Sequence, residues 1–194
     1  AHGAEMFVTL EPCCHFGKTP PCVDAIILAG LKKVYIGTID PNKLVLKKGV
    51  NILRKKGIIV EVGVLKKECD YLNESFAKFI RTGKPFVIMK SGISLDGKIA
   101  TSSGESNWIT CEKSRRLVHK VRREVDAILI GSGTVLKDDP KLTARLKTRK
   151  LKSPARVILD RRSRISVNAK VFENSDRDKV IYVTSPRISK KKEK

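Results

Sequence analysis

Short apolar blocks separated by turn-forming residues fill the first third of the chain. The blocks at 6–10, 34–39 and 58–64 predict strands, because they are short, rich in β-branched residues and bounded by turn signals. The blocks at 22–29 and 50–56 predict helices, and Gly30 is suited to end the first of them in a left-handed conformation. Because strand and helix alternate, the sequence predicts an α/β sheet with helices on its faces.

The segment 66–80 carries apolar residues at spacings of three and four, which predicts one amphipathic helix. The polar stretch 81–85 follows and contains both Gly and Pro, which is typical of a boundary between domains. The sequence therefore predicts one domain over 1–80 and a second over 81–194.

The second part of the chain repeats the strand-and-helix pattern. Basic residues line one face of the segment 112–125 and apolar residues line the other, which predicts an amphipathic helix. Leu95-Asp96-Gly97 is a tight-turn signal. Further apolar blocks predict strands at 85–90, 127–130, 156–160 and 179–184.

The charge of the chain is strongly positive, since 41 Lys and Arg residues against 20 Asp and Glu residues give +21. Such a charge suits nucleic acid or phosphorylated small molecules. Aromatic residues make up only 5% and do not alternate with the basic ones, which argues against a single-strand binding surface. The sequence shows no apolar run of membrane-spanning length and no signal segment, so we expect a cytoplasmic protein without a membrane partner.

Three of the five cysteines, Cys13, Cys14 and Cys22, lie within ten residues. Cys13 follows a predicted strand and Cys22 opens a predicted helix, so their two thiolates can share one tetrahedral metal ion. A helix N-terminus also favours the thiolate form of Cys22. The alternative is a set of buried, inert cysteines.

The string VTLEPCCHFGKTPPC resembles the pyrimidine deaminase of the bifunctional riboflavin-biosynthesis deaminase/reductase family. The cysteines of that family have eight residues between them, as Cys13 and Cys22 do, whereas nucleic-acid and cytidine deaminases usually separate theirs by two. The resemblance implies that Cys13 and Cys22 bind zinc and that Cys14 does not. It also implies substrate contacts, with a phosphate near Lys18, from His15, Lys18, Asp40 and Asn42. For Asp40 and Asn42 an ordinary turn is the alternative, and at Lys47 relatives often carry Gly, so we expect a locally different loop there.

A zinc deaminase also needs a His-x-Glu motif, which supplies a third ligand and the proton-transferring carboxylate. The nearest match is His2-Gly3-Ala4-Glu5, which has one residue too many and lies just before the first predicted strand. We interpret His2 and Glu5 as an accidental pair and assign no catalytic residue. The true motif is expected upstream of Ala1, so this chain by itself is not expected to deaminate.

A second set of motifs lies between residues 85 and 160. Gly131 and Gly133 follow a predicted strand, where backbone amides can approach phosphate, although a plain strand–turn–helix has the same pattern. Together with segments such as GESNWIT, these motifs are similar to the reductase domain of the same family. The resemblance implies NADPH contacts from Gly92, Trp108, Thr134 and Asp138. It implies substrate contacts from Ser106, Arg122, Leu142 and Arg145. A solvated helix face for Arg122 and a core position for Trp108 are the alternatives.

Taken together, the resemblance implies an α/β chain with the C-terminal part of a cytidine-deaminase-like domain, followed by the first part of a dihydrofolate-reductase-like domain. It implies Zn²⁺ and NADPH as cofactors and a phosphorylated pyrimidine as substrate. Two alternatives stay open, a nucleic-acid or nucleoside deaminase and a non-catalytic zinc-binding module. The reductase motifs argue against both, and homo-oligomerisation is left open.

Overall fold

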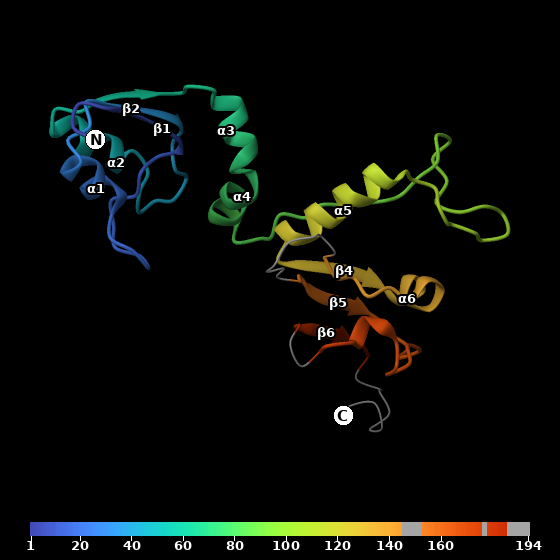
Figure 1. Ribbon diagram of the computed structural model, residues 1–194. Coiled ribbons are helices and arrows are strands. Elements are labelled where there is room, and N and C mark those ends of the chain that lie inside the picture. Colours follow the sequence, from blue (N-terminus) through green and yellow to red (C-terminus); the bar gives the residue numbers. More distant parts are fainter. Residues whose placement is uncertain (145–152, 176–177, 186–194) are drawn as a thin grey trace. The chain divides into compact units, whose positions relative to one another are not determined.

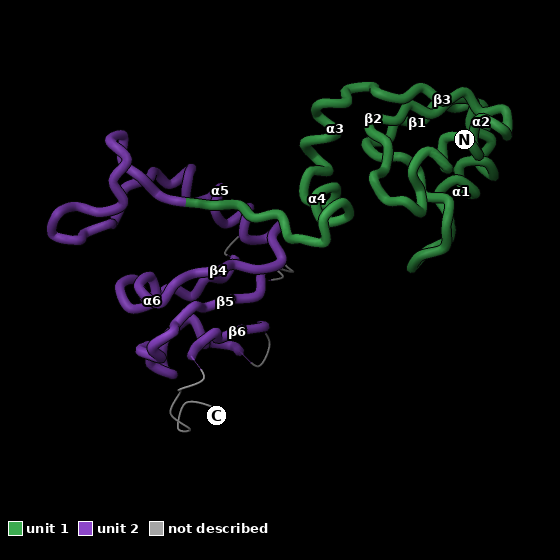
Figure 2. Tube along the Cα trace, turned by 180° about the vertical axis from the view of Figure 1, so that it is seen from behind, with its two compact units in different colours: residues 1–90 green, residues 91–194 purple. Residues whose placement is uncertain are grey.

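The computed structural model describes residues 1–144, 153–175 and 178–185. By their contacts these residues form two compact units, Ala1–Lys90 and Ser91–Lys194 (Figures 1 and 2). Each unit contains one three-stranded parallel sheet. The predicted α/β class is therefore confirmed, and the structure shows that both sheets are parallel.

The sheet of the first unit has the order β1-β2-β3, and helices α1 and α2 connect its strands (Figure 1). Both helices bury apolar residues against one face, where Val34 and Ile36 of β2 are fully buried. Gly30 ends the first connection with a left-handed φ of 63°, as the sequence predicts. All five elements fall where the sequence predicts them: β1 (Glu5–Leu10), α1 (Cys22–Leu28), β2 (Lys33–Thr38), α2 (Lys48–Lys55) and β3 (Ile59–Val62).

The segment after β3 forms two helices, α3 (Lys66–Leu72) and α4 (Glu74–Thr82), so the prediction of one continuous helix is wrong. The break falls at Asn73, whose side-chain Nδ2 donates to the carbonyl of Cys69 at 2.8 Å. The backbone N–H of Asn73 donates to the same carbonyl at 3.1 Å, so both groups of Asn73 bind the end of α3.

Helix α3 packs on the other face of the sheet, against Gly37. A Cβ atom on Gly37 would lie 2.1 Å from the sulfur of Cys69. The missing side chain of Gly37 therefore lets α3 approach the centre of the sheet.

The sheet of the second unit has the order β4-β5-β6. Its buried core consists of Val135, Leu142, Ile158, Ile165 and Val171. The helix predicted over 112–125 and the strands predicted at 127–130, 156–160 and 179–184 are confirmed. The elements are α5 (Glu112–Glu124), β4 (Ala127–Gly131), α6 (Ser132–Asp138), β5 (Ala155–Leu159), η1 (Lys170–Phe172) and β6 (Val180–Val183).

The segment 85–90 does not form the predicted strand. A strand requires a hydrogen-bonded neighbour, and this segment pairs with none of the strands in the described ranges. Its apolar side chains are correspondingly exposed, Met89 to 93%. The segment lies at the end of the first unit, and α4 continues to Thr82, past the predicted boundary after residue 80.

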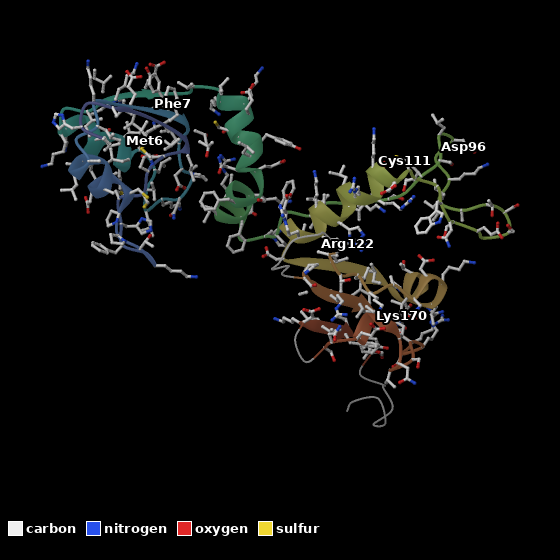
Figure 3. The ribbon with its side chains drawn as sticks, viewed as in Figure 1. Met6, Phe7, Asp96, Cys111, Arg122 and Lys170 are labelled. Carbon is white, nitrogen blue, oxygen red and sulfur yellow. The ribbon has the colours of Figure 1, made fainter. Side chains whose placement is uncertain are left out.

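The turn predicted at Leu95-Asp96-Gly97 is present, with a left-handed φ of 79° at Gly97. It belongs to the long segment before α5, where Figure 3 labels Asp96. Across the part of the chain that the structure describes, no helix is both long enough and apolar enough to span a membrane.

Candidate functional site

The two predicted zinc ligands meet at the carboxyl end of β1. Cys22 is the first residue of α1, and its backbone N–H donates to the sulfur of Cys13 at 3.3 Å. The backbone N–H of Val23 also donates to the carbonyl of Cys13, at 3.2 Å. The loop between the two cysteines is thus closed by the start of a helix, as the pattern of strand, loop and helix predicts.

The pKa of Cys22 differs from the expectation. The pKa of the Cys22 thiol is raised, mainly because the thiol hydrogen-bonds to the Cys13 side chain, and also by burial and by the negative charge of Cys13. The neighbouring sulfur thus acts against the thiolate form that the helix N-terminus is expected to favour.

The side chains at this position meet part of the requirement for a zinc site. Two sulfurs at the start of one helix are typical zinc ligands. Nearby in sequence, Nδ1 of His15 is buried and lacks a hydrogen-bond partner. No group of three His, Cys, Asp or Glu side chains in the described ranges gathers closely enough to hold a metal ion. The loop therefore brings two sulfurs together, and zinc binding by them stays a prediction.

The neighbouring cysteine and lysine have different surroundings. The thiol of Cys14 donates to the carbonyl of Leu44 at 3.6 Å and packs against the core of the first unit. This packing agrees with the prediction that Cys14 is not a ligand. Lys18 is exposed in the same loop.

Asp40 and Asn42 form a compact turn just after β2. Oδ1 of Asp40 accepts the N–H of Asn42 at 2.8 Å, and Oδ1 of Asn42 accepts the N–H of Leu44 at 3.0 Å. Asp40 is only 5% exposed, so its carboxylate serves mainly to shape this turn. Substrate contacts by Asp40 and Asn42 stay a prediction.

Glu11 connects this turn to the cysteine loop, and the sequence reasoning gave it no role. Its carboxylate is 3% exposed and accepts three backbone N–H groups, from Asp40 at 3.3 Å, Lys47 at 3.0 Å and Val50 at 3.2 Å. Glu11 stands two residues before Cys13. One buried carboxylate therefore fixes the cysteine loop, the Asp40 turn and the start of α2 relative to one another.

Two backbone features occur where α2 meets the cysteine loop. A Cβ atom on Gly49 would lie 2.2 Å from the carbonyl oxygen of Pro12, so α2 can approach the cysteine loop only with glycine there. Lys47 has a left-handed φ of 59°, the conformation that glycine prefers. Lys47 therefore adopts a backbone conformation for which glycine is the better-suited residue.

His2 and Glu5 lie at the opposite end of β1 from the cysteines. Glu5 begins the strand, which has six residues, and Cys13 follows its other end. Six residues of strand span roughly 20 Å. The ring of His2 packs against Gly30 instead, which confirms that His2 and Glu5 are not part of the cysteine site.

In the second unit, several predicted cofactor residues lie at the carboxyl end of β4. This strand runs directly into α6, which carries Thr134 and Asp138 as exposed residues. The loop containing Ser106 and Trp108 also comes near α6, because a Cβ atom on Gly104 would lie 3.4 Å from Nζ of Lys137. Gly92, by contrast, lies earlier in the long segment before α5.

Trp108 is 74% exposed, so the core alternative for this residue is wrong. The guanidinium of Arg115 lies over its ring, 4.3 Å from the centroid. A cation in this position stabilises the ring through a cation–π contact. An exposed, oriented indole is available to a ligand.

Two of the remaining predicted substrate residues lie near each other. Arg122 projects from α5 (Figure 3). Its Nη1 donates to the carbonyl of Thr143 at 3.4 Å. Arg122 is therefore tied to the backbone beside Leu142, which is 5% exposed and packs in the core. Arg145 lies outside the described residues.

A buried polar network at the carboxyl edge of this sheet was missed from the sequence. Asp160 follows β5, is 1% exposed, and accepts the N–H of Ile165 at 2.9 Å and the hydroxyl of Tyr182 at 2.8 Å. Burial raises the pKa of the Asp160 carboxyl, but these hydrogen bonds and the charge of Arg164 together lower it below its ordinary value. Arg164 also donates to Ser132 at 2.7 Å, so the network reaches the start of α6.

Comparison with known proteins shows which family this chain resembles. Residues 85–194 match the RibD C-terminal domain family. The riboflavin biosynthesis protein RibD of Aquifex aeolicus is 47% identical over 190 residues, which covers 98% of this chain and 53% of that protein. The RibD protein of Actinobacillus pleuropneumoniae is 45% identical, covering 94% of this chain and 48% of that protein.

Solved structures agree with these matches. A diaminohydroxyphosphoribosylaminopyrimidine deaminase/5-amino-6-(5-phosphoribosylamino)uracil reductase from Thermotoga maritima is 49% identical, with a TM-score of 0.82. The similarity covers 92% of this chain and 50% of that one. RibD of Acinetobacter baumannii is 43% identical with a TM-score of 0.81, covering 93% of this chain and 51% of that one.

The parallel α/β sheets, the cysteine pair at one sheet edge and the match to the RibD C-terminal domain agree with one family. The chain belongs to the RibD family, which confirms the resemblance stated from its sequence. It spans about half the length of the curated relatives it matches.

Proposed function

We propose that this chain is part of a bifunctional enzyme of riboflavin biosynthesis. One activity is the zinc-dependent hydrolytic deamination of a phosphoribosylaminopyrimidine, and the other is the NADPH-dependent reduction of its ribosyl group to ribityl. The observation that carries the proposal is the pairing of Cys13 with Cys22 at the carboxyl end of β1. The same chain then continues into the matched RibD C-terminal domain.

In the deaminase part, Cys13 and Cys22 would hold Zn²⁺. When bound, the metal supplies the activation of water that hydrolytic deamination requires. His15, Lys18 and the Asp40 turn would orient the phosphorylated pyrimidine. Glu11 positions these groups, because its carboxylate holds the turn against the cysteine loop.

In the reductase part, the cofactor supplies the hydride, and the protein binds and orients the two partners. Gly92, Trp108, Thr134 and Asp138 would bind NADPH. The substrate would lie against Ser106, Leu142 and two cations, Arg122 and Arg145, which suit its phosphate. We propose for these two parts the cytidine-deaminase-like and dihydrofolate-reductase-like folds, divided near residue 80, and a cytoplasmic enzyme acting on small molecules.

The deaminase assignment is tested by zinc binding to the purified chain. Zinc stoichiometry, measured by metal analysis after dialysis, is expected to fall when Cys13→Ser or Cys22→Ser removes one sulfur. Cys111→Ser is the matched control, because Cys111 is an exposed cysteine in the second unit. Unchanged stoichiometry in Cys13→Ser would contradict the ligand assignment.

The reductase assignment is tested on the same protein with NADPH. Trp108 is the only tryptophan of the chain, so its fluorescence reports binding at its own position. NADPH is expected to quench this emission with saturation, and Thr134→Val is expected to weaken the binding. Quenching that rises linearly with NADPH, without saturation, would show that no site forms around Trp108 and Thr134.

A further inference from the structure

The first unit contains a cavity that is separate from the cysteine site. Its volume is about 460 Å³, within the range of ~300–1,000 Å³ usual for small-molecule pockets. It lies at the carboxyl ends of β2 and β3, and residues from α3, α4 and the loop before α2 also line it. Neither the cysteine pair nor Lys18, Asp40 or Asn42 lines it.

The charged groups of this cavity are mostly cationic. Lys47, Lys66 and Arg81 line it together with a single carboxylate, Asp70. That carboxylate is already engaged, since it forms an ion pair with Lys66 and accepts the hydroxyl of Thr38 at 2.6 Å. Neither Lys47 nor Arg81 forms an ion pair with any residue that the structure describes.

The cavity also has an apolar lining. Ile39, Pro41, Leu46 and Val62 contribute it, together with Gly37 and Gly63 near the strand ends. A ligand that fits must therefore combine a compact negative group with a carbon body. The cavity also lies beyond the carboxyl ends of parallel strands, the edge at which α/β sheets bind their ligands.

We propose that this cavity binds a phosphate monoester of a small molecule, with the phosphate held by Lys47 and Arg81. The guanidinium of Arg81 can offer paired donors to phosphate oxygens, and Lys47 adds a point charge. The carbon body of the ligand lies against Leu46 and Val62. This assignment does not depend on the proposed function, because it uses none of the residues assigned to either active site.

The site also reaches the cysteine loop through one residue. The backbone N–H of Lys47 donates to Glu11, whose other partners are Asp40 and Val50. A ligand held by the Lys47 side chain therefore stabilises the turn that Glu11 organises. Occupancy is expected to slow amide exchange at Asp40 and Lys47.

The test is a titration of the full chain with ribose 5-phosphate, inorganic phosphate and ribose, followed by amide NMR shifts of Gly37 and Gly63. Ribose 5-phosphate is expected to shift both amides with saturation and to bind more tightly than inorganic phosphate. Ribose is expected to cause no shift. Equal affinities for inorganic phosphate and ribose 5-phosphate would overturn the assignment of a monoester.

Variants locate the site. Lys47→Gly combined with Arg81→Ala is expected to weaken binding at least about tenfold, because each cation makes a charge-assisted contact. Glycine is chosen because it relieves the left-handed backbone of Lys47, so folding is preserved. Lys55→Ala combined with Lys67→Ala removes the same charge elsewhere in this unit and is expected to change affinity less than about twofold.

Two results would overturn the proposal. An equal loss in both double variants would show that only the overall positive field attracts the anion. Loss of the Gly37 and Gly63 shifts in Lys18→Ala would place the bound phosphate in the cysteine loop instead of the cavity. Retained binding in Lys18→Ala, together with loss in the Lys47 and Arg81 variant, supports it.

Discussion

Glu11 is the single side chain on which the geometry of the cysteine loop depends most. In Glu11→Ala, three backbone N–H groups lose their acceptor. Two of them belong to the buried residues Asp40 and Val50, whereas Lys47 is exposed and its N–H can turn to water. A buried donor without a partner costs about 1–3 kcal/mol, so the two together lower the free energy of unfolding by about 4 kcal/mol.

Glu11→Gln is expected to cost about half as much. The amide keeps one acceptor oxygen, but its NH₂ group must face at least one of the same backbone donors, which leaves about 2 kcal/mol of loss. Glu61→Gln is the control, because Glu61 is a half-exposed carboxylate on β3 that pairs with Lys33 at 2.8 Å. Surface ion pairs contribute about 0–1 kcal/mol.

Native-state amide exchange measures these losses within the first unit. The amides of Val34 and Ile36 in the central strand report the opening of this sheet, independently of the second unit. In Glu11→Gln, exchange at Asp40 and Val50 is also expected to accelerate more than exchange at Val34. A Glu11→Ala protein within about 1 kcal/mol of the wild type would refute the reasoning, because a buried carboxylate with three donors cannot be so dispensable.

Two further predictions concern the packing and the pH response. Gly49→Ala is expected to destabilise the first unit by about 2 kcal/mol or more, because the added Cβ would meet the Pro12 carbonyl. This loss exceeds the roughly 1 kcal/mol by which alanine favours a helix over glycine. Thermal unfolding measures the loss against Asn51→Ala, an exposed position on the same helix, and equal stability of the two variants would contradict the prediction. The lowered pKa of Asp160 stabilises the second unit above the unfolded value of 3.8, and this contribution is lost as the pH falls through the lower folded value. The difference in unfolding free energy between wild type and Asp160→Asn should therefore shrink below about pH 4, and a difference independent of pH would contradict the proposed cause.

The sequence by itself determined the strand and helix alternation and the family. Local patterns fix these features, because burial of one face and turn chemistry act over a few residues. The Cys13 and Cys22 pattern likewise predicted a loop closed by a helix start, and the structure places the backbone N–H of Cys22 3.3 Å from the sulfur of Cys13.

Predictions from the sequence were wrong where a contact with another residue decided the outcome. The segment 85–90 has the composition of a strand but lacks a neighbouring strand among the described residues, and composition cannot supply one. The helix predicted over 66–80 breaks at Asn73, where the side chain binds a backbone carbonyl. The pKa of Cys22 is raised by Cys13, a residue nine positions away in sequence.

Only the tertiary structure showed the importance of Glu11, Gly49 and Asp160. Each lies next to a motif in the sequence, yet its partners come from segments up to about forty residues away, such as Val50 for Glu11. A buried carboxylate is stable only where the fold delivers enough donors to it, and a glycine is required only where another backbone approaches closely. These conditions depend on how distant segments pack, which the order of residues does not display.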